Sequence, residues 1–223
     1  MTLALGLGKS GAMSGKFLVF EGLDGSGKST LIRGLEEELR KRGLQLRLTR
    51  EPGGTPLAED IRRLLLRTDS EVPVPATELL LYAASRAQHV ANVIKPALAQ
   101  GEWVLCDRFT ASTVAFQCFA RGLNRVEVDW LNQFATQGTR PDLTILLDLS
   151  VEESRRRQLG REGSSPDRME KESHAFHEAV RNGYLAQAKE NPNDWLVLDA
   201  TLGPDELVQR TLREFKERGW LES

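Results

Sequence analysis

One short segment, residues 22–29, constrains the fold of this chain more than any other. Its residues, Gly-Leu-Asp-Gly-Ser-Gly-Lys-Ser, match the pattern G-x-x-x-x-G-K-[ST] at every fixed position. An apolar, β-prone stretch at 17–20 precedes it, and apolar residues at helical spacing follow it at 31–39. A strand, a glycine-rich turn and a helix in this order form a loop whose backbone N–H groups surround an anion. The segment therefore predicts a phosphate-binding site, with Lys28 reaching terminal phosphate oxygens and the Ser29 hydroxyl on Mg²⁺.

Alternating apolar runs and helical patterns extend this unit into a fold. Five short strands separated by helices predict an α/β protein of three layers, in which a five-stranded parallel sheet carries helices on both faces. We expect residues 1–14 to be a flexible extension and 15–223 to form one domain. The expected strands are 16–21, 45–49, 103–106, 143–147 and 195–198, and the expected helices are 28–42, 58–67, 77–99, 111–120, 126–137, 151–158, 171–189 and 204–218.

Composition excludes several classes of protein. A net charge of −2 gives no basic field for nucleic acid. No apolar run reaches the roughly 18–20 residues of a membrane span. The two cysteines, Cys106 and Cys118, have no metal-ligand spacing, and the first 15 residues make a poor secretory signal. We therefore expect a cytoplasmic protein that binds neither nucleic acid nor membrane.

Polar residues at the carboxyl ends of the expected strands are the candidate site, because ligands bind at that edge of such sheets. Asp107 is placed to hold Mg²⁺, directly or through water, although an Asp after a strand is often a helix N-cap. Asp148 has the sequence context of a structural turn or cap. The others are Asp24, Arg50, Glu51 and Arg108.

Arginines cluster around a stretch rich in glycine and polar residues, 160–166. Three arginines precede this stretch, namely Arg155, Arg156 and Arg157. Arg161 lies within it and Arg168 follows it. Arginine suits phosphoryl transfer because its planar fork grips phosphate oxygens and stays charged. The cluster predicts a lid at about 155–168 that closes over a nucleotide. The alternative for any single arginine is a solvated basic helix face.

Several motifs, taken in order, resemble those of bacterial thymidylate kinases from residue 16 to the C-terminus. They are the phosphate loop at 20–30, Thr-Arg-Glu-Pro-Gly-Gly-Thr at 49–55, Glu-Leu-Leu-Leu-Tyr-Ala-Ala-Ser-Arg at 78–86, Asp-Arg-Phe at 107–109 and Arg-Pro-Asp-Leu-Thr at 140–144. The resemblance implies phosphorylation of dTMP to dTDP with ATP and Mg²⁺ in dTTP synthesis, and a homodimer.

The resemblance also implies roles for individual residues. ATP would be held by the loop and one lid residue, namely Gly22, Leu23, Asp24, Gly25, Ser26, Gly27, Lys28, Ser29, Thr30 and Arg157. The acceptor would be held by Asp24, Arg50, Glu51, Pro52, Tyr82, Arg86, Arg108, Thr113, Phe116 and Gln117. Within this set Arg50 and Arg108 position the acceptor phosphate, Tyr82 stacks on thymine and Arg86 hydrogen-bonds the base. Catalysis would involve Lys28, Arg108, Asp24 and Arg161, and the metal would involve Ser29 and Asp107.

Three details distinguish this chain within the family. Its phosphate loop carries no arginine, which is typical of bacterial members whose lid arginine reaches the transferred phosphate, and we assign that role to Arg161. Phe116 stands where the family often has Tyr, so the preference for deoxyribose is open. Tyr82 stands where the family usually has Phe, which adds a hydroxyl.

Three other functions stay open on sequence grounds. One is another P-loop kinase that acts on deoxynucleosides or on other nucleoside monophosphates. The second is a nucleotide-binding regulator without turnover, which the intact Lys28, Ser29, Asp24 and Arg108 argue against. The third is a nucleic-acid-dependent ATPase, which the net charge of −2 does not favour.

Overall fold

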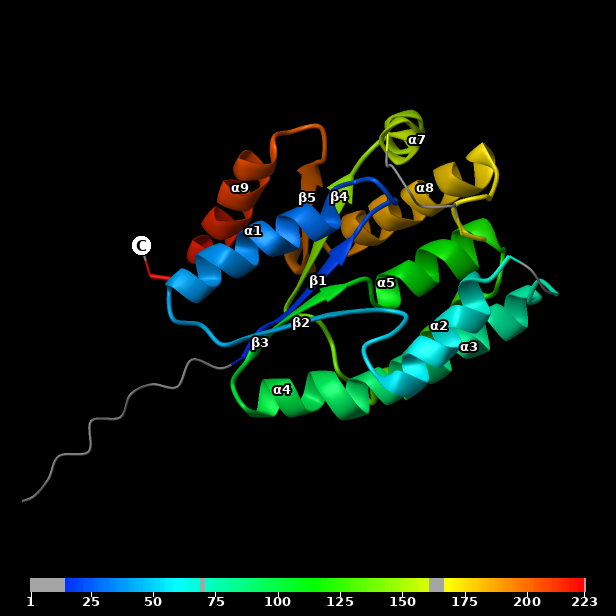
Figure 1. The fold of residues 1–223 in the computed structure, drawn as a ribbon, viewed down its shortest axis with the longest axis horizontal. Helices are drawn as coiled ribbons and strands as arrows, with labels where there is room; N and C mark the ends of the chain where they lie inside the picture. Colours follow the sequence, from blue (N-terminus) through cyan, green and yellow to red (C-terminus); the bar gives the residue numbers. More distant parts are fainter. Residues whose placement is uncertain (1–14, 69–70, 161–166, 223) are drawn as a thin grey trace, which may run out of the picture.

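A single parallel sheet forms the centre of the protein. The computed structural model describes residues 15–68, 71–160 and 167–222. Within these ranges five strands pair in the order β2-β3-β1-β4-β5 (Figure 1). The predicted parallel sheet is confirmed, and every strand boundary lies within one residue of the prediction. The strands are β1 (Phe17–Glu21), β2 (Leu46–Arg50), β3 (Trp103–Asp107), β4 (Leu143–Asp148) and β5 (Trp195–Asp199).

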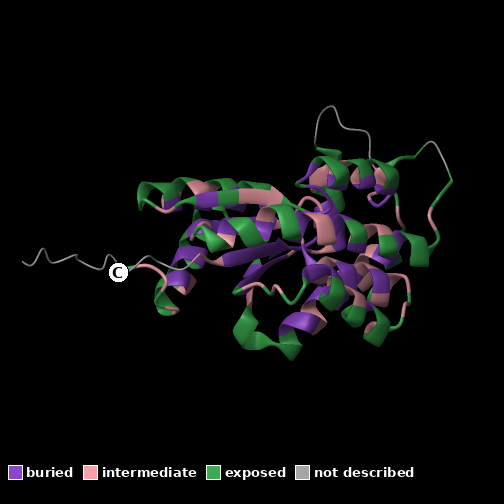
Figure 2. Cartoon of the chain, turned by 90° about the horizontal axis from the view of Figure 1, so that it is seen from below, coloured by how far each residue is buried: buried purple, intermediate pink, exposed green. Residues whose placement is uncertain are grey.

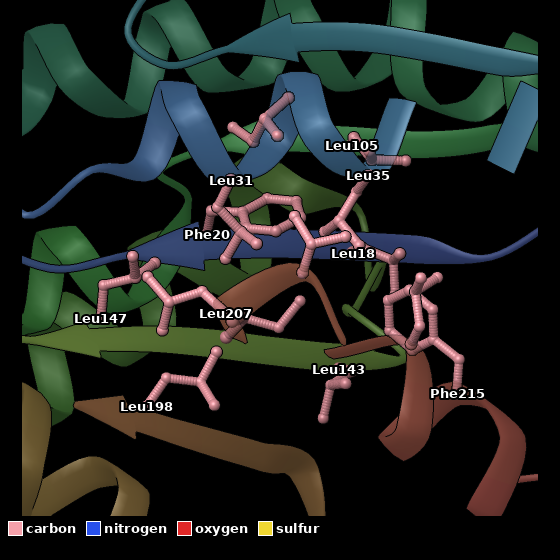
Figure 3. Close-up of a cluster of buried hydrophobic side chains, with 14 of the residues drawn as sticks. Leu18, Phe20, Leu31, Leu35, Leu105, Leu143, Leu147, Leu198, Leu207 and Phe215 are labelled. Carbon is pink, nitrogen blue, oxygen red and sulfur yellow. The ribbon is translucent and has the colours of Figure 1, made fainter. Parts of the chain in front are cut away.

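Successive residues of β1 point to opposite faces of the sheet, so both faces carry apolar side chains. Leu18 and Phe20 belong to a core with helices α1 (Lys28–Lys41) and α9 (Pro204–Glu217) (Figure 3). Phe17 and Val19 pack on the other face, against the segment 90–97. Figure 2 shows the buried strands lying between helices whose outer surfaces are exposed. The three layers predicted from the sequence are present.

The second face is covered by long helical segments. One runs without a break through α3 (Pro75–His89), the π-helical Val90–Ile94 and α4 (Lys95–Ala99). A second joins α5 (Thr110–Thr113) to the π-helical Val114–Ala120. The remaining helices are α2 (Pro56–Leu66), α6 (Arg125–Thr136), α7 (Val151–Leu159), α8 (His174–Glu190) and the 3₁₀ turn Pro192–Asp194. None of the described helices combines the length and apolar character needed to cross a membrane.

Three predicted helix starts differ from the structure by two or three residues. The helix α3 begins at Pro75 rather than 77, with proline in its first turn, and for the other two the capping residues explain the difference. The helix α2 begins at Pro56 rather than 58, because the Thr55 hydroxyl accepts a hydrogen bond from the backbone N–H of Ala58. The helix α8 begins at His174 rather than 171, because Ser173 caps it by accepting from the N–H of Phe176. Residues 168–171 instead form a turn.

Strand register brings distant residues to one edge of the sheet. Asp107 at the end of β3 lies opposite both Phe20 of β1 and Arg50 of β2. The loop after β1 leads directly into α1, so the helix N-terminus faces the same edge. Residues that follow β1, β2 and β3 therefore surround one region.

Candidate active site

A cavity of about 240 Å³ opens at this edge. The phosphate loop lies on one side and the segments after β2 and β3, with α3, lie on the other. Sixteen of the predicted site residues line it, namely Asp24, Gly25, Gly27, Lys28, Ser29, Thr30, Arg50, Glu51, Pro52, Tyr82, Arg86, Asp107, Arg108, Thr113, Phe116 and Gln117. Gly22, Leu23, Ser26 and Arg157 are outside its wall, and Arg161 lies outside the described residues.

The phosphate loop has the backbone that its glycines allow. Gly22, Gly25 and Gly27 have φ values of 133°, 83° and 97°, in the region that favours glycine. At Gly22 a Cβ would lie 2.5 Å from the carbonyl oxygen of Leu147, so a side chain there would collide with β4. The loop is therefore packed directly on the sheet and ends at the N-terminus of α1, where backbone N–H groups favour an anion.

Lys28 folds back over this loop. Its Nζ donates to the carbonyl oxygens of Gly22 at 3.0 Å and Leu23 at 3.1 Å. Burial lowers the pKa of Lys28. The two hydrogen bonds hold the ammonium in the cavity wall, 3.9 Å from Asp24 Oδ1.

Asp107 presents an unusual oxygen. Its Oδ1 is buried and accepts no hydrogen bond from the described residues. Such an atom is costly unless a cation or a water supplies the missing interaction. Carboxylate and hydroxyl oxygens are the ligands that Mg²⁺ prefers, and Ser29 lines the same cavity. The donor set therefore fits the predicted metal.

Arg108 is the centre of a hydrogen-bond network across the cavity. Its Nη2 donates to Asp24 Oδ1 at 2.8 Å, and its Nη1 donates to the Tyr184 hydroxyl at 2.9 Å and to Ser112 Oγ at 3.3 Å. Its φ is 71°, which is uncommon for a residue other than glycine. Strained conformations of this kind persist only where surrounding contacts hold them, often at functional sites.

Glu21, at the end of β1, belongs to the same hydrogen-bond network. It is fully buried and accepts from the N–H of Phe109 at 2.9 Å and from the Ser112 hydroxyl at 2.6 Å. Burial raises the pKa of Glu21. Glu21, Ser112 and Tyr184 were not predicted as site residues.

Arg86 is anchored by four hydrogen bonds. Its Nε donates to Glu51 at 2.7 Å, and Nη1 donates to Thr113 at 2.8 Å and Asn132 at 2.7 Å. Its Nη2 donates to the carbonyl oxygen of Phe109 at 3.0 Å. A guanidinium has five N–H groups, so among the described residues one is left for a ligand. Asn132 was not predicted, although it fixes this side chain.

The rest of the cavity wall is aromatic and polar. Arg108 lies over the Phe116 ring, with 5.5 Å between the guanidinium carbon and the ring centroid. Tyr82 lines the cavity one helical turn before Arg86, as predicted. Burial raises the pKa of the Tyr82 phenol. Gln117 is fully buried in the same wall.

The entrance carries two arginines. Arg50 forms an ion pair with Glu59, with Nη2 at 2.9 and 3.0 Å from the two carboxylate oxygens. Arg62 of α2 also lines the cavity and donates to the carbonyl oxygen of Pro52 at 3.1 Å. Arg62 was not predicted, and its hydrogen bond to Pro52 joins α2 to the loop that follows Arg50.

The described part of the predicted lid is tied to the protein at both ends. Arg157 donates to Gly25 O at 3.5 Å and to Ala200 O at 3.0 Å. Arg168 is buried, pairs with Glu78 at 2.5 Å and donates to Leu65 O at 2.9 Å. Arg168 is therefore a structural cation. Asp148 also has a structural role, as an ion-pair partner of Arg181 in α8 at 2.7 Å rather than as a cap.

Comparison with known proteins identifies the family. The model of the family described as thymidylate kinase matches residues 20–211 of this chain. The chain belongs to the thymidylate kinase family. It is 55% identical over 206 residues to the thymidylate kinase of Bdellovibrio bacteriovorus, which covers 91% of this chain and 96% of the relative. It is 49% identical over 197 residues to that of Geotalea daltonii, covering 86% and 92%.

The fold of the family agrees as well. The crystal structure of thymidylate kinase from Ehrlichia chaffeensis matches with a TM-score of 0.72 and 31% identity, over 91% of this chain and 99% of that one. The resemblance predicted from the motifs is confirmed, and a different P-loop kinase is not favoured. As a member of the thymidylate kinase family, the chain is a phosphotransferase.

Proposed function

We propose that this protein transfers the terminal phosphoryl group of ATP to dTMP, with Mg²⁺, at the cavity described above. The observation that carries the proposal is that one cavity is lined both by the phosphate loop and by Tyr82, Arg86 and Gln117. A candidate phosphate site and a candidate base-reading site therefore share one cavity. Neither half alone would distinguish a kinase from a nucleotide-binding protein.

On the donor side, the ATP phosphates bind the loop amides and Lys28, with Thr30 and Arg157 beside them. Ser29 and Asp107 would hold Mg²⁺, because Asp107 Oδ1 is buried and accepts no hydrogen bond from the described residues. When bound, Mg²⁺ neutralises charge on the transferring phosphoryl group. Arg161 of the lid, at about 155–168, supplies a further positive charge and completes the predicted catalytic set.

On the acceptor side, the 5′-phosphate of dTMP binds Arg108 and Arg50, while Glu51 and Pro52 line its wall. Tyr82 stacks on thymine, and the remaining N–H of Arg86 donates to the O4 carbonyl of the base. Thr113 holds Arg86 for this contact. An acceptor phosphate oxygen is already an anion, so transfer requires positioning and charge neutralisation rather than a general base.

We further propose that the protein is a cytoplasmic homodimer whose residues 15–223 form one domain. The helix α6 supports dimerisation, because its outer face exposes Val126, Trp130 and Phe134 at 76%, 65% and 68%. These residues are four apart and share one face, and the rings of Trp130 and Phe134 stack 5.7 Å apart. Two free cysteines, Cys106 and Cys118, are consistent with a reducing compartment.

Initial-rate kinetics test the main proposal. ADP release coupled to a reporter enzyme is measured with dTMP, dUMP, UMP, CMP and thymidine as acceptors. We expect dTMP to give the highest kcat/KM and thymidine to give none, because thymidine lacks the phosphate that Arg50 and Arg108 bind. Failure to phosphorylate both dTMP and dUMP would remove the proposed function.

A further inference from the structure

Glu78 is the buried group that the proposed reaction leaves unexplained. It lies in the first turns of α3 with no exposed surface, and it is a charged side chain. An acidic residue near a helix N-terminus is favourable, but an exposed one gives that benefit without the cost of burial. Its burial therefore points to another role.

The contacts of Glu78 connect two parts of the site. One oxygen, Oε1, accepts from the Nε2 amide of Gln117 at 2.7 Å. The other, Oε2, pairs with Arg168 at 2.5 Å, and Arg121 lies 3.4 Å from both oxygens. Paired with two guanidinium groups, the carboxylate offers acceptors alone, so it selects the NH₂ end of the Gln117 amide.

This selection fixes which atom Gln117 offers to a ligand. With Nε2 used by Glu78, the carbonyl Oε1 is directed away from it, and Oε1 is buried without a hydrogen-bond donor among the described residues. A buried acceptor of this kind costs roughly 1–3 kcal/mol unless a donor is supplied. Gln117 lies in the wall of the cavity, so the ligand is the available source of that donor.

We propose that Glu78 is a positioning residue that sets base specificity by locking the Gln117 amide with its oxygen as the ligand-facing atom. The inference rests on the proposed function. The pair formed by one donor, Arg86, and one acceptor, Gln117 Oε1, complements the O4 carbonyl and N3–H of thymine or uracil. Cytosine offers the reverse arrangement, an N4 amino group and an unprotonated N3, and would leave both protein groups unpaired.

The test compares dTMP with dCMP as acceptors in the wild type, Glu78→Gln and Glu172→Gln. Glutamine at 78 can donate as well as accept, so it permits Gln117 to turn its NH₂ group toward the ligand. We expect E78Q to lower kcat/KM for dTMP at least tenfold, mainly through KM, and to narrow the dTMP to dCMP ratio at least tenfold. Glu172 is the matched control, because it also pairs with Arg121, at 2.6 Å, and has no hydrogen bond to Gln117 among the described contacts. E172Q should keep the wild-type ratio within about twofold.

A second variant keeps the proposal testable if E78Q does not fold. Glu78→Asp keeps the negative charge for Arg121 and Arg168, but its side chain is one methylene shorter, so its carboxylate lies farther from the Gln117 amide. We expect E78D, like E78Q, to lower the ratio of kcat/KM for dTMP to that for dCMP. Circular dichroism and the KM for ATP verify that each variant is folded and binds donor. An unchanged dTMP to dCMP ratio in a folded E78Q or E78D protein would overturn the inference while leaving the proposed function intact. A wild type that does not phosphorylate dTMP would instead remove the proposed function.

Discussion

Arg108 Nη2 donates a 2.8 Å hydrogen bond to Asp24 Oδ1, and both residues line the cavity. Arg108 follows β3, and Asp24 lies in the phosphate loop after β1. The bond therefore connects the residue proposed to bind the acceptor phosphate with the loop proposed to bind the donor. Since the reacting oxygens must lie in line, a shared contact of this kind aligns the two substrates.

Replacing Arg108 tests this alignment. Arg108→Lys keeps a cation but loses the planar fork that reaches Asp24 and Tyr184 together. We expect kcat/KM for dTMP to fall by about 10²-fold, with a smaller change in the KM for ATP. Arg47→Lys, in the exposed pair with Glu102, is the control and should have wild-type kinetics. Equal losses for the two variants would contradict a specific role for Arg108.

The low pKa of Lys28 predicts an alkaline limit to ATP binding. Burial lowers the pKa of Lys28, so its charge is lost as pH rises through a value below the ordinary ~10.4. We expect kcat/KM for ATP, which reports the free enzyme, to fall over that range. Burial raises the pKa of both Tyr82 and Tyr184, so neither phenol produces this limb. In Lys28→Arg the limb should disappear, and its persistence would assign it to another group.

Arg161 is the proposed lid cation. We expect Arg161→Ala to lower kcat by about 10³-fold or more, the range that arginines acting on transferred phosphoryl groups have elsewhere. Arg156→Ala is the matched control, because Arg156 is 74% exposed and paired with Glu153. Near-wild-type turnover in R161A would exclude the assignment. Rapid-quench measurement of the phosphoryl-transfer step separates it from product release.

Phe116 provides a test of sugar preference. Phe116→Tyr adds a hydroxyl to the cavity wall, and we expect it to disfavour a ribose 2′-OH by about tenfold, or roughly 1.4 kcal/mol. The measurement is the ratio of kcat/KM for dUMP and UMP, which share a base. Phe119→Tyr is the control, because Phe119 belongs to the same π-helical segment but does not line the cavity. A ratio that is equal in wild type and F116Y would show that this position does not read the sugar.

The exposed face of α6 predicts how the oligomer dissociates. Trp130→Glu places a charge in the centre of the apolar stripe, and burying it against a partner would be costly. We expect sedimentation velocity to show a dimer for the wild type and a monomer for W130E. Leu159→Glu alters an apolar side chain that is 89% exposed on α7 and should leave the dimer intact. A monomeric wild type would contradict the proposal directly.

Most of the sheet and most residues of the cavity wall could be predicted from the sequence, for different reasons. The strands are short apolar runs, and the phosphate loop fixes the first strand, turn and helix. Asp107 and Arg108 are predictable because polar residues that follow parallel strands meet at one edge. The capped starts of α2 and α8 were missed because Thr55 and Ser173 compete with flanking residues that also suit helices.

The unpredicted residues act through contacts between distant parts of the chain. Ser112 and Tyr184 are 72 positions apart, and Glu21 and Ser112 are 91 apart, yet each pair is hydrogen-bonded. Buried Glu, Ser and Tyr have no spacing that marks them as partners in a single sequence. The π-helical segments are likewise invisible, because their side chains follow the same apolar pattern as an α-helix over so few residues.

The helix α6 has a buried face that contacts Arg86 and an exposed apolar face. On its inner face, Asn132 accepts a 2.7 Å hydrogen bond from Arg86. On its outer face, Trp130 and Phe134 are exposed. The side chain that holds Arg86, the residue proposed to read the base, and the proposed subunit contact therefore belong to the same helix. If this face of α6 forms the proposed subunit contact, we expect association of two subunits and the affinity of each for the monophosphate to be thermodynamically linked.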